Sequence, residues 1–97
     1  MGQTEASMAQ RASIPEHVVH RAFPAETVLL NLQTGKYHGL NRSGARIFEF
    51  IERDGSLATV AQKLSEFYER PLAEMQADVL AFCDDMVGSG LLTLEPA

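Results

Sequence analysis

The sequence has a single cysteine, Cys83, and no tryptophan among its 97 residues. One cysteine cannot form an intrachain disulfide, and it excludes a cysteine-rich metal site. The apolar runs are short and do not approach the ~20 residues that span a bilayer. The first residues lack the basic segment and following apolar stretch of a secretion signal. We therefore predict a cytoplasmic chain with no membrane partner.

Basic residues are also few, with eight Lys and Arg against thirteen Asp and Glu, which gives a formal charge of -5. Such a chain repels the phosphate backbone of nucleic acids. A recognition helix in a winged helix-turn-helix protein needs cationic or amide side chains. The last predicted helix instead carries Glu74, Asp78, Asp84 and Asp85. We predict no nucleic-acid partner and keep a winged-helix nucleic-acid-binding protein only as an alternative function.

Catalytic groups are scarce as well. At 10.7 kDa the chain forms one small domain without room for a deep cofactor cavity. Cys83 lies on an apolar stripe with Phe82 and Met86, which predicts a buried, unreactive thiol. His17 and His20 would point to opposite faces of a strand, so they are poorly placed to share a metal. We predict no enzyme, with no catalytic residue, no metal and no cofactor.

Alternation of apolar residues indicates where strands begin. Residues 1–13 lack apolar periodicity, so we predict a disordered tail there and a single domain at 14–97. Three β-prone runs follow, over about His17–Phe23, Glu26–Leu32 and Lys36–Leu40. They predict a small three-stranded antiparallel sheet.

The turn between the second and third runs is Gln33-Thr34-Gly35, where Gly35 can adopt a positive φ. A two-residue loop and a three-residue loop with a bulge give different registers, and a slip of one residue turns every side chain over. We prefer an inward-facing set made of Val28, Leu30 and Leu32. The facing of Tyr37 and His38 stays open at this point.

The apolar period then changes to 3.6, which predicts three helices. Asn41 is suited to cap the first, at about 42–53, and Ser56 the second, at about 57–69. Gly44 in the first turn suggests close approach to another backbone. The third helix starts at Pro71 and stops at Gly88-Ser89-Gly90. After it, a short extended segment is expected over Leu91, Leu92 and Leu94.

The predicted fold is therefore α+β, a three-stranded antiparallel sheet followed by three helices, in outline like a winged helix-turn-helix. Its vulnerable feature is an uncovered edge strand, Lys36–Leu40, which can pair with an incoming extended peptide. Beside it, Gly39 would leave space and Asp78 would offer an acceptor. The alternative for Tyr37 is a core or hairpin-stacking aromatic, and for Asp78 an ordinary solvated residue.

The hairpin segment VLLNLQTGKYHGLN, residues 28–41, followed by Gly44-Ala45-Arg46-Ile47, resembles the hairpin-into-helix signature of the PqqD-like family. The segments Asp78-Val79-Leu80-Ala81-Phe82 and Gly90-Leu91-Leu92 are similar to its third helix and the end of that helix. The resemblance covers about residues 17–94 and looks closer to the stand-alone recognition proteins of lasso-peptide and similar clusters than to the PQQ protein itself.

The resemblance implies a RiPP recognition element, a non-catalytic domain that serves ribosomally synthesised and post-translationally modified peptides. Such a domain binds the leader region of a precursor peptide as a strand added beside the third strand and against the third helix. It presents the leader to a modifying enzyme, such as a leader protease or a radical-SAM enzyme. A third possibility is a structural subunit of a biosynthetic enzyme, and two copies could form a homodimer through exposed edges. The expected peptide-binding residues are Lys36, Tyr37, His38, Gly39, Leu40, Asp78, Ala81, Phe82 and Asp85.

Overall fold

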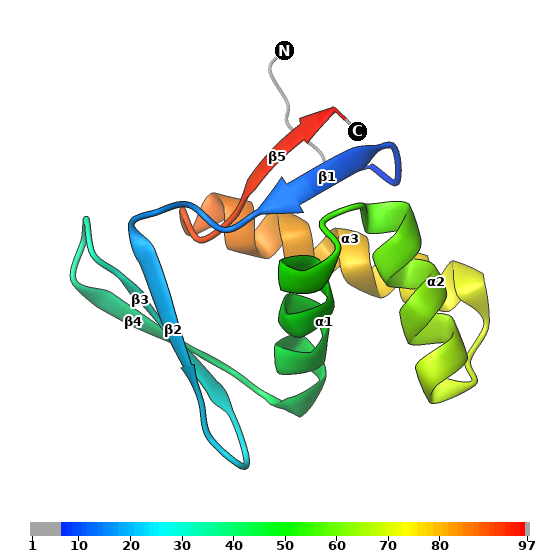
Figure 1. Cartoon of the computed structure of the whole chain (residues 1–97), viewed down its shortest axis with the longest axis horizontal. Helices are drawn as coiled ribbons and strands as arrows, with labels where there is room; N and C mark the ends of the chain where they lie inside the picture. The colour runs from blue at the N-terminus through cyan, green and yellow to red at the C-terminus, as the bar shows by residue number, and fades with distance from the viewer. Residues whose placement is uncertain (1–6, 97) are drawn as a thin grey trace.

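Five strands and three helices make up residues 7–96, the part of the chain that the computed structural model describes (Figure 1). The strands are β1 (Gln10–Ser13), β2 (Val18–Ala22), β3 (Thr27–Asn31), β4 (Lys36–Leu40) and β5 (Thr93–Pro96). The helices are α1 (Arg42–Arg53), α2 (Leu57–Tyr68) and α3 (Leu72–Gly88). Strands β2, β3 and β4 form one antiparallel sheet, in that order. This confirms the predicted α+β fold.

The molecule is flat, with extents of 39 × 37 × 18 Å. The sheet stands on one side, α1 lies next to it, and α3 passes behind α1 (Figure 1). No helix within residues 7–96 is long and apolar enough to cross a membrane.

Strand β1 corrects the prediction of a disordered tail over residues 1–13. Gln10–Ser13 pairs with β5 in a separate two-stranded ribbon, in which the Ser13 and Thr93 hydroxyls lie 2.9 Å apart. Ala12 in this strand is buried. The segment is ordered by a partner 80 residues away in sequence, so local periodicity could not reveal it. Residues 1–6 lie outside the described part.

The β3–β4 hairpin has a four-residue loop, so both loop lengths considered above are wrong. The Asn31 side chain accepts hydrogen bonds from the amides of Gln33 and Thr34, and its carbonyl accepts one from Gly35. Gly35 has the expected positive φ, 76°. Asn31 therefore pairs with Lys36, and the face toward the core carries Thr27, Leu29 and Asn31.

The preferred inward set of Val28, Leu30 and Leu32 is wrong, because this register turns it to the other side. Leu32 lies in the loop and is 57% exposed. Within β3 the apolar Val28 and Leu30 lie on the outer face, whereas the buried inner face carries the polar Thr27 and Asn31 beside Leu29, so the apolar alternation indicated the wrong face.

The helix predictions hold closely, because the capping residues act as expected. The Asn41 side chain accepts from the Gly44 amide at 2.9 Å, and the Ser56 hydroxyl accepts from the Thr59 amide. Helix α1 has the predicted bounds, and α2 and α3 differ from expectation by about one residue. Gly44 does mark a close approach, but to the Phe82 ring rather than to a backbone.

The core joins the inner face of the sheet to one face of each helix. Leu29 of β3 and Phe48 of α1 are almost fully buried there, and α3 contributes Val79, Cys83 and Met86. Burial, with the nearby Asp84 carboxylate, raises the pKa of the Cys83 thiol to about 12. This confirms Cys83 as a buried core residue and fixes which face of α3 is left for other contacts.

Candidate functional site

Hydrogen bonds between β2 and β3 determine which backbone groups of β4 are unused. The Phe23 amide donates to the Glu26 carbonyl, and the Leu32 amide donates to the His17 carbonyl, both at 2.7 Å. Bonded positions alternate along an antiparallel pair, so residues 26, 28, 30 and 32 direct their backbone groups to β2. Residues 27, 29 and 31 then bond to β4, where their partners are Leu40, His38 and Lys36.

The two remaining residues of β4, Tyr37 and Gly39, therefore direct their N–H and C=O groups away from the sheet. Among the described residues no strand pairs with β4 on that side, and β5 pairs with β1 instead. Backbone groups of this kind are a template for an added strand. The predicted open edge is thus present on β4.

A groove lies between α3 and residues 36–47, which form β4 and the start of α1, and it has a hollow at each end. One hollow, about 280 Å³, is lined by Asn31, Thr34, Lys36, Tyr37, His38, Gly88, Ser89 and Leu91. The other, about 210 Å³, is lined by Ser43, Ile47, Leu64, Tyr68, Arg70, Glu74, Met75 and Asp78. The start of β4 thus lies near the end of α3, and the chain beyond β4 lies near the first half of α3.

Phe82 of α3 lies near Leu40, the last residue of β4, and between the two hollows along the helix. A Cβ atom at Gly44 would lie 3.6 Å from the Phe82 ring and 3.7 Å from Leu40 Cβ. Leu40 is buried and Phe82 is half-buried. These side chains form an apolar floor between the two hollows.

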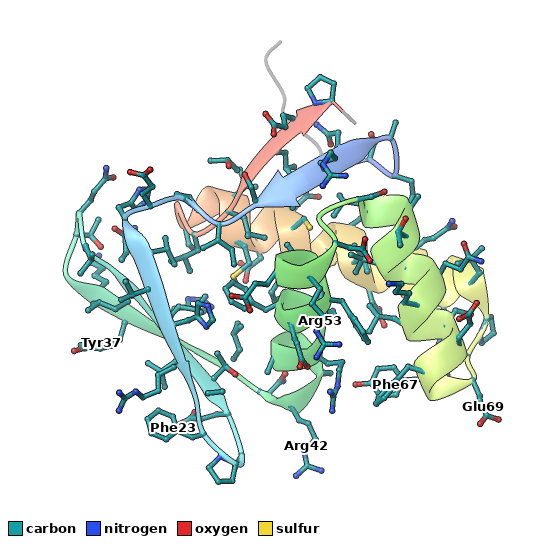
Figure 2. The ribbon with its side chains drawn as sticks, in the orientation of Figure 1. Phe23, Tyr37, Arg42, Arg53, Phe67 and Glu69 are labelled. Carbon is teal, nitrogen blue, oxygen red and sulfur yellow. The ribbon has the colours of Figure 1, made fainter. Side chains whose placement is uncertain are left out.

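The structure brings the predicted site residues to one region, but not to one surface. Lys36, His38 and Leu40 have their side chains on the inner face of the sheet, with Leu29. Tyr37 is 73% exposed and lies on the side of the sheet away from the helices (Figure 2), so the core-aromatic alternative is wrong. Of the predicted site residues on α3, Asp78, Ala81 and Asp85 are exposed and Phe82 is half-buried.

Uncompensated charges remain in the groove. Glu74 is paired with Arg70 at its far end. None of the ion pairs within residues 7–96 involves Asp78, Asp85 or Lys36. The α3 side of the groove is therefore acidic, and the start of β4 carries a cation.

Sequence reasoning missed the residues that build the hollows, among them Ser43, Ile47, Tyr68, Met75, Gly88 and Leu91. They come from α1, from α2, from both ends of α3 and from the segment that follows it, and only the tertiary arrangement brings them together. Gly44 was the one local signal, because a glycine in the first turn of a helix permits close packing.

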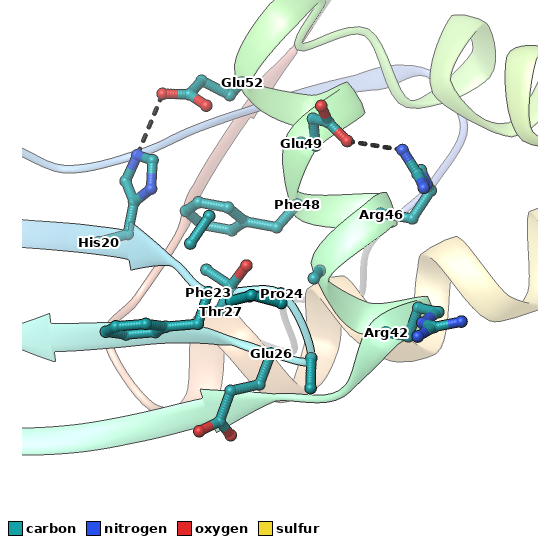
Figure 3. A pocket seen from close by; sticks show the side chains of 13 residues that line it. His20, Phe23, Pro24, Glu26, Thr27, Arg42, Arg46, Phe48, Glu49 and Glu52 are labelled. Carbon is teal, nitrogen blue, oxygen red and sulfur yellow. Dashed lines mark hydrogen bonds and ion pairs between the residues drawn. The ribbon is translucent and has the colours of Figure 1, made fainter.

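A separate hollow of about 470 Å³ lies between the β2–β3 loop and α1 (Figure 3). Its charged walls are largely paired internally: His20 with Glu52 at 3.1 Å, and Arg46 with Glu49 at 3.0 Å. Both histidines have other partners: His20 lies against Glu52 in this hollow, and His17 Nε2 lies 3.0 Å from the Gly90 carbonyl oxygen.

Comparison with known proteins identifies a family for this chain. The family described as "Coenzyme PQQ synthesis protein D (PqqD)" matches residues 26–92, which include β3, β4 and all three helices. No curated protein matches the chain.

Two solved structures share the fold. "TbiB1 in Complex with the TbiA(beta) Leader Peptide" has a TM-score of 0.77 and 29% identity, over 81% of this chain and 92% of that chain. "Lasso peptide synthetase B1 complexed with the leader peptide" has a TM-score of 0.77 and 24% identity, over 86% of this chain and 98% of that chain. Since the family match spans more than half of the sequence and includes the β4 edge with α3, the chain belongs to the PqqD family.

Proposed function

We propose that this chain binds the leader region of a ribosomally synthesised precursor peptide, which adds as a strand to β4 and packs against α3. The single observation that carries the proposal is the open edge of β4, where the backbone groups of Tyr37 and Gly39 face a groove rather than another strand. The structures of similar fold support it, because both are complexes with a leader peptide.

The groove offers both parts of a strand-addition site. Backbone groups on β4 supply affinity for any extended segment, while the hollows and Phe82 select side chains. A segment of this kind buries on the order of 1,000 Å² in total and reaches micromolar affinity when a few apolar side chains are seated. The proposed contact residues are Lys36, Tyr37, His38, Gly39, Leu40, Asp78, Ala81, Phe82 and Asp85.

The chain acts as an adaptor in this proposal, and chemistry belongs to the partner. It holds the leader while a modifying enzyme in the cytoplasm, such as a leader protease or a radical-SAM enzyme, works on the rest of the precursor. Membership of the PqqD family supports this role. A structural subunit would instead bind the enzyme and ignore the leader.

The test is a titration of the purified full chain into a fluorescently labelled leader peptide, taken from the precursor encoded beside its gene. A scrambled leader is the matched control, and the TbiA(beta) leader is a second probe. We expect saturable binding of the cognate leader and at least about tenfold weaker binding of the scrambled peptide. Equal binding of both peptides, or binding to the enzyme alone, would refute the proposal.

A further inference from the structure

We propose that the peptide bound at β4 is basic on the side that faces α3, with two Lys or Arg residues four positions apart and an apolar residue midway. This inference rests on the proposed function and specifies the class of segment that the groove selects.

The acidic side chains share one stripe of α3. Asp78, Phe82 and Asp85 recur at i, i+4 and i+7, the spacing of a single helix face. The two hollows give the position of each end of this stripe. Asp78 lines the hollow that contains Ser43. Ser89, four residues after Asp85, lines the hollow that contains Lys36. Asp85 therefore lies between Phe82 and the hollow beside Lys36 on this face of the helix.

The register of an added strand decides which guest side chains meet this stripe. Guest residues opposite Tyr37 and Gly39 place their side chains on the outer face, as those two residues do. Guest residues opposite Lys36, His38 and Leu40 place theirs on the inner face, toward α3. Only every second side chain of the bound peptide can therefore contact α3.

Distances favour a separation of four positions over two. Seven helical residues separate the two Asp side chains by about 10.5 Å along the axis. Guest positions two apart are separated by about 7 Å and positions four apart by about 13 Å. The second spacing is closer, and it also leaves the midway residue over Phe82, which lies between the two acids.

Charge determines the chemistry of the outer two positions. The Asp78 and Asp85 carboxylates are exposed and have no ion pair within residues 7–96, so they repel an acidic guest and attract a basic one. Lys36 gives the start of β4 the opposite charge, which disfavours a third basic residue there.

The experiment selects binders from a random 12-residue peptide library displayed on mRNA, using the full chain as bait. We expect selected peptides to be enriched in pairs of Lys or Arg four positions apart, with an apolar residue between them. Each of D78N and D85N should then weaken the best peptide about two- to fivefold, and 0.5 M salt should reduce the difference. E66Q removes an exposed carboxylate of α2 that lines neither hollow, and it should leave binding unchanged.

The experiment can refute this inference without refuting the proposed function. Selected peptides that bind G39P more weakly, but carry no basic pair and bind D78N and D85N as well as the unchanged chain, would overturn the inference. That result would still support strand addition to β4. Peptides that bind equally well to G39P would overturn both. Asn preserves the shape of Asp, and circular dichroism checks that each variant is folded.

Discussion

The sheet has two outer strands of equal length, β4 and β2, and only one of them meets the requirements of a peptide site. On β2 the outward backbone groups belong to Val18, His20 and Ala22, and the Val18 amide already donates to the Pro15 carbonyl at 3.0 Å. Two hollows lie between β2 and α1. One is lined largely by charged and polar groups of the β1–β2 region and α1, and most charged side chains of the other are paired with each other. An open edge is therefore not sufficient, because affinity also needs apolar side chains facing it.

On β4, Tyr37 lines a hollow that contains Leu91, and Leu40 lies near Phe82 at the other end of the strand. A second hollow, beyond the end of β4, contains Ile47 and Met75. The difference between the two edges depends on α3. One face of this helix packs in the core, and its other face borders the groove.

The largest effect concerns the closed face of α3. Because the pKa of the Cys83 thiol rises from 9.0 to about 12, roughly a thousandfold fewer thiolates exist at pH 8 in the folded chain than in the unfolded one. Labelling with iodoacetamide, followed by mass spectrometry, should be at least about a hundredfold slower in the folded chain. Rapid labelling at pH 8 would show that α3 leaves the core and that the groove is not permanent.

The same shift has a consequence for stability. The folded thiol holds its proton more tightly than the unfolded thiol, so its contribution is complete below pH 9 and is lost as pH rises toward 12. Chemical denaturation at pH 8 and pH 10 should show lower stability at pH 10, and C83A should lessen the difference.

The second prediction compares proline on the two edges. Gly39→Pro removes an outward amide of β4 and should raise the Kd for the leader at least about tenfold, while costing folding about 1 kcal/mol. Ala22→Pro removes an outward amide of β2 and should leave the Kd within about twofold. Titration and thermal unfolding measure the two quantities.

Gly39→Ala is the matched control, because it keeps the amide. A Cβ atom at Gly39 meets only the flexible Glu26 carboxylate, at 3.5 Å, so this variant should fold and bind normally. If Ala22→Pro weakened leader binding more than Gly39→Pro, the guest strand would belong to β2.

The smallest effect concerns the apolar side chains near each edge. Phe82→Ala removes the floor of the β4 groove and should weaken leader binding about three- to tenfold. Ile14→Ala removes a partly buried side chain beside β2 and should change stability but not leader binding. Equal losses of binding in the two variants would mean that affinity follows stability rather than a local contact.

Much of this comparison was visible in the sequence. The helical periods, the caps Asn41 and Ser56, and the Lys36–Leu40 bounds are local features, and they were predicted correctly. The edge strand could be predicted for the same reason, because five adjacent residues determine its length and polarity.

The remaining features depend on contacts between distant residues. Strand β1 exists because β5 pairs with it, and the hairpin register depends on Asn31, whose side chain holds the loop. Without the register, the outward amides of Tyr37 and Gly39 could not be separated from those that bond to β3. One hollow of the groove combines residues of three helices, and the other joins the hairpin to the end of α3, so no single segment of the sequence predicts either of them.

Hydrogen exchange of the β4 amides, followed by NMR with and without the cognate leader, most directly tests whether a guest strand completes this sheet. We expect that the Tyr37 and Gly39 amides, exposed in the unbound chain, become strongly protected from exchange when the leader binds. The protection of the His20 and Ala22 amides should not change. Protection confined to β2, or saturating binding with no protection at Tyr37 and Gly39, would contradict it.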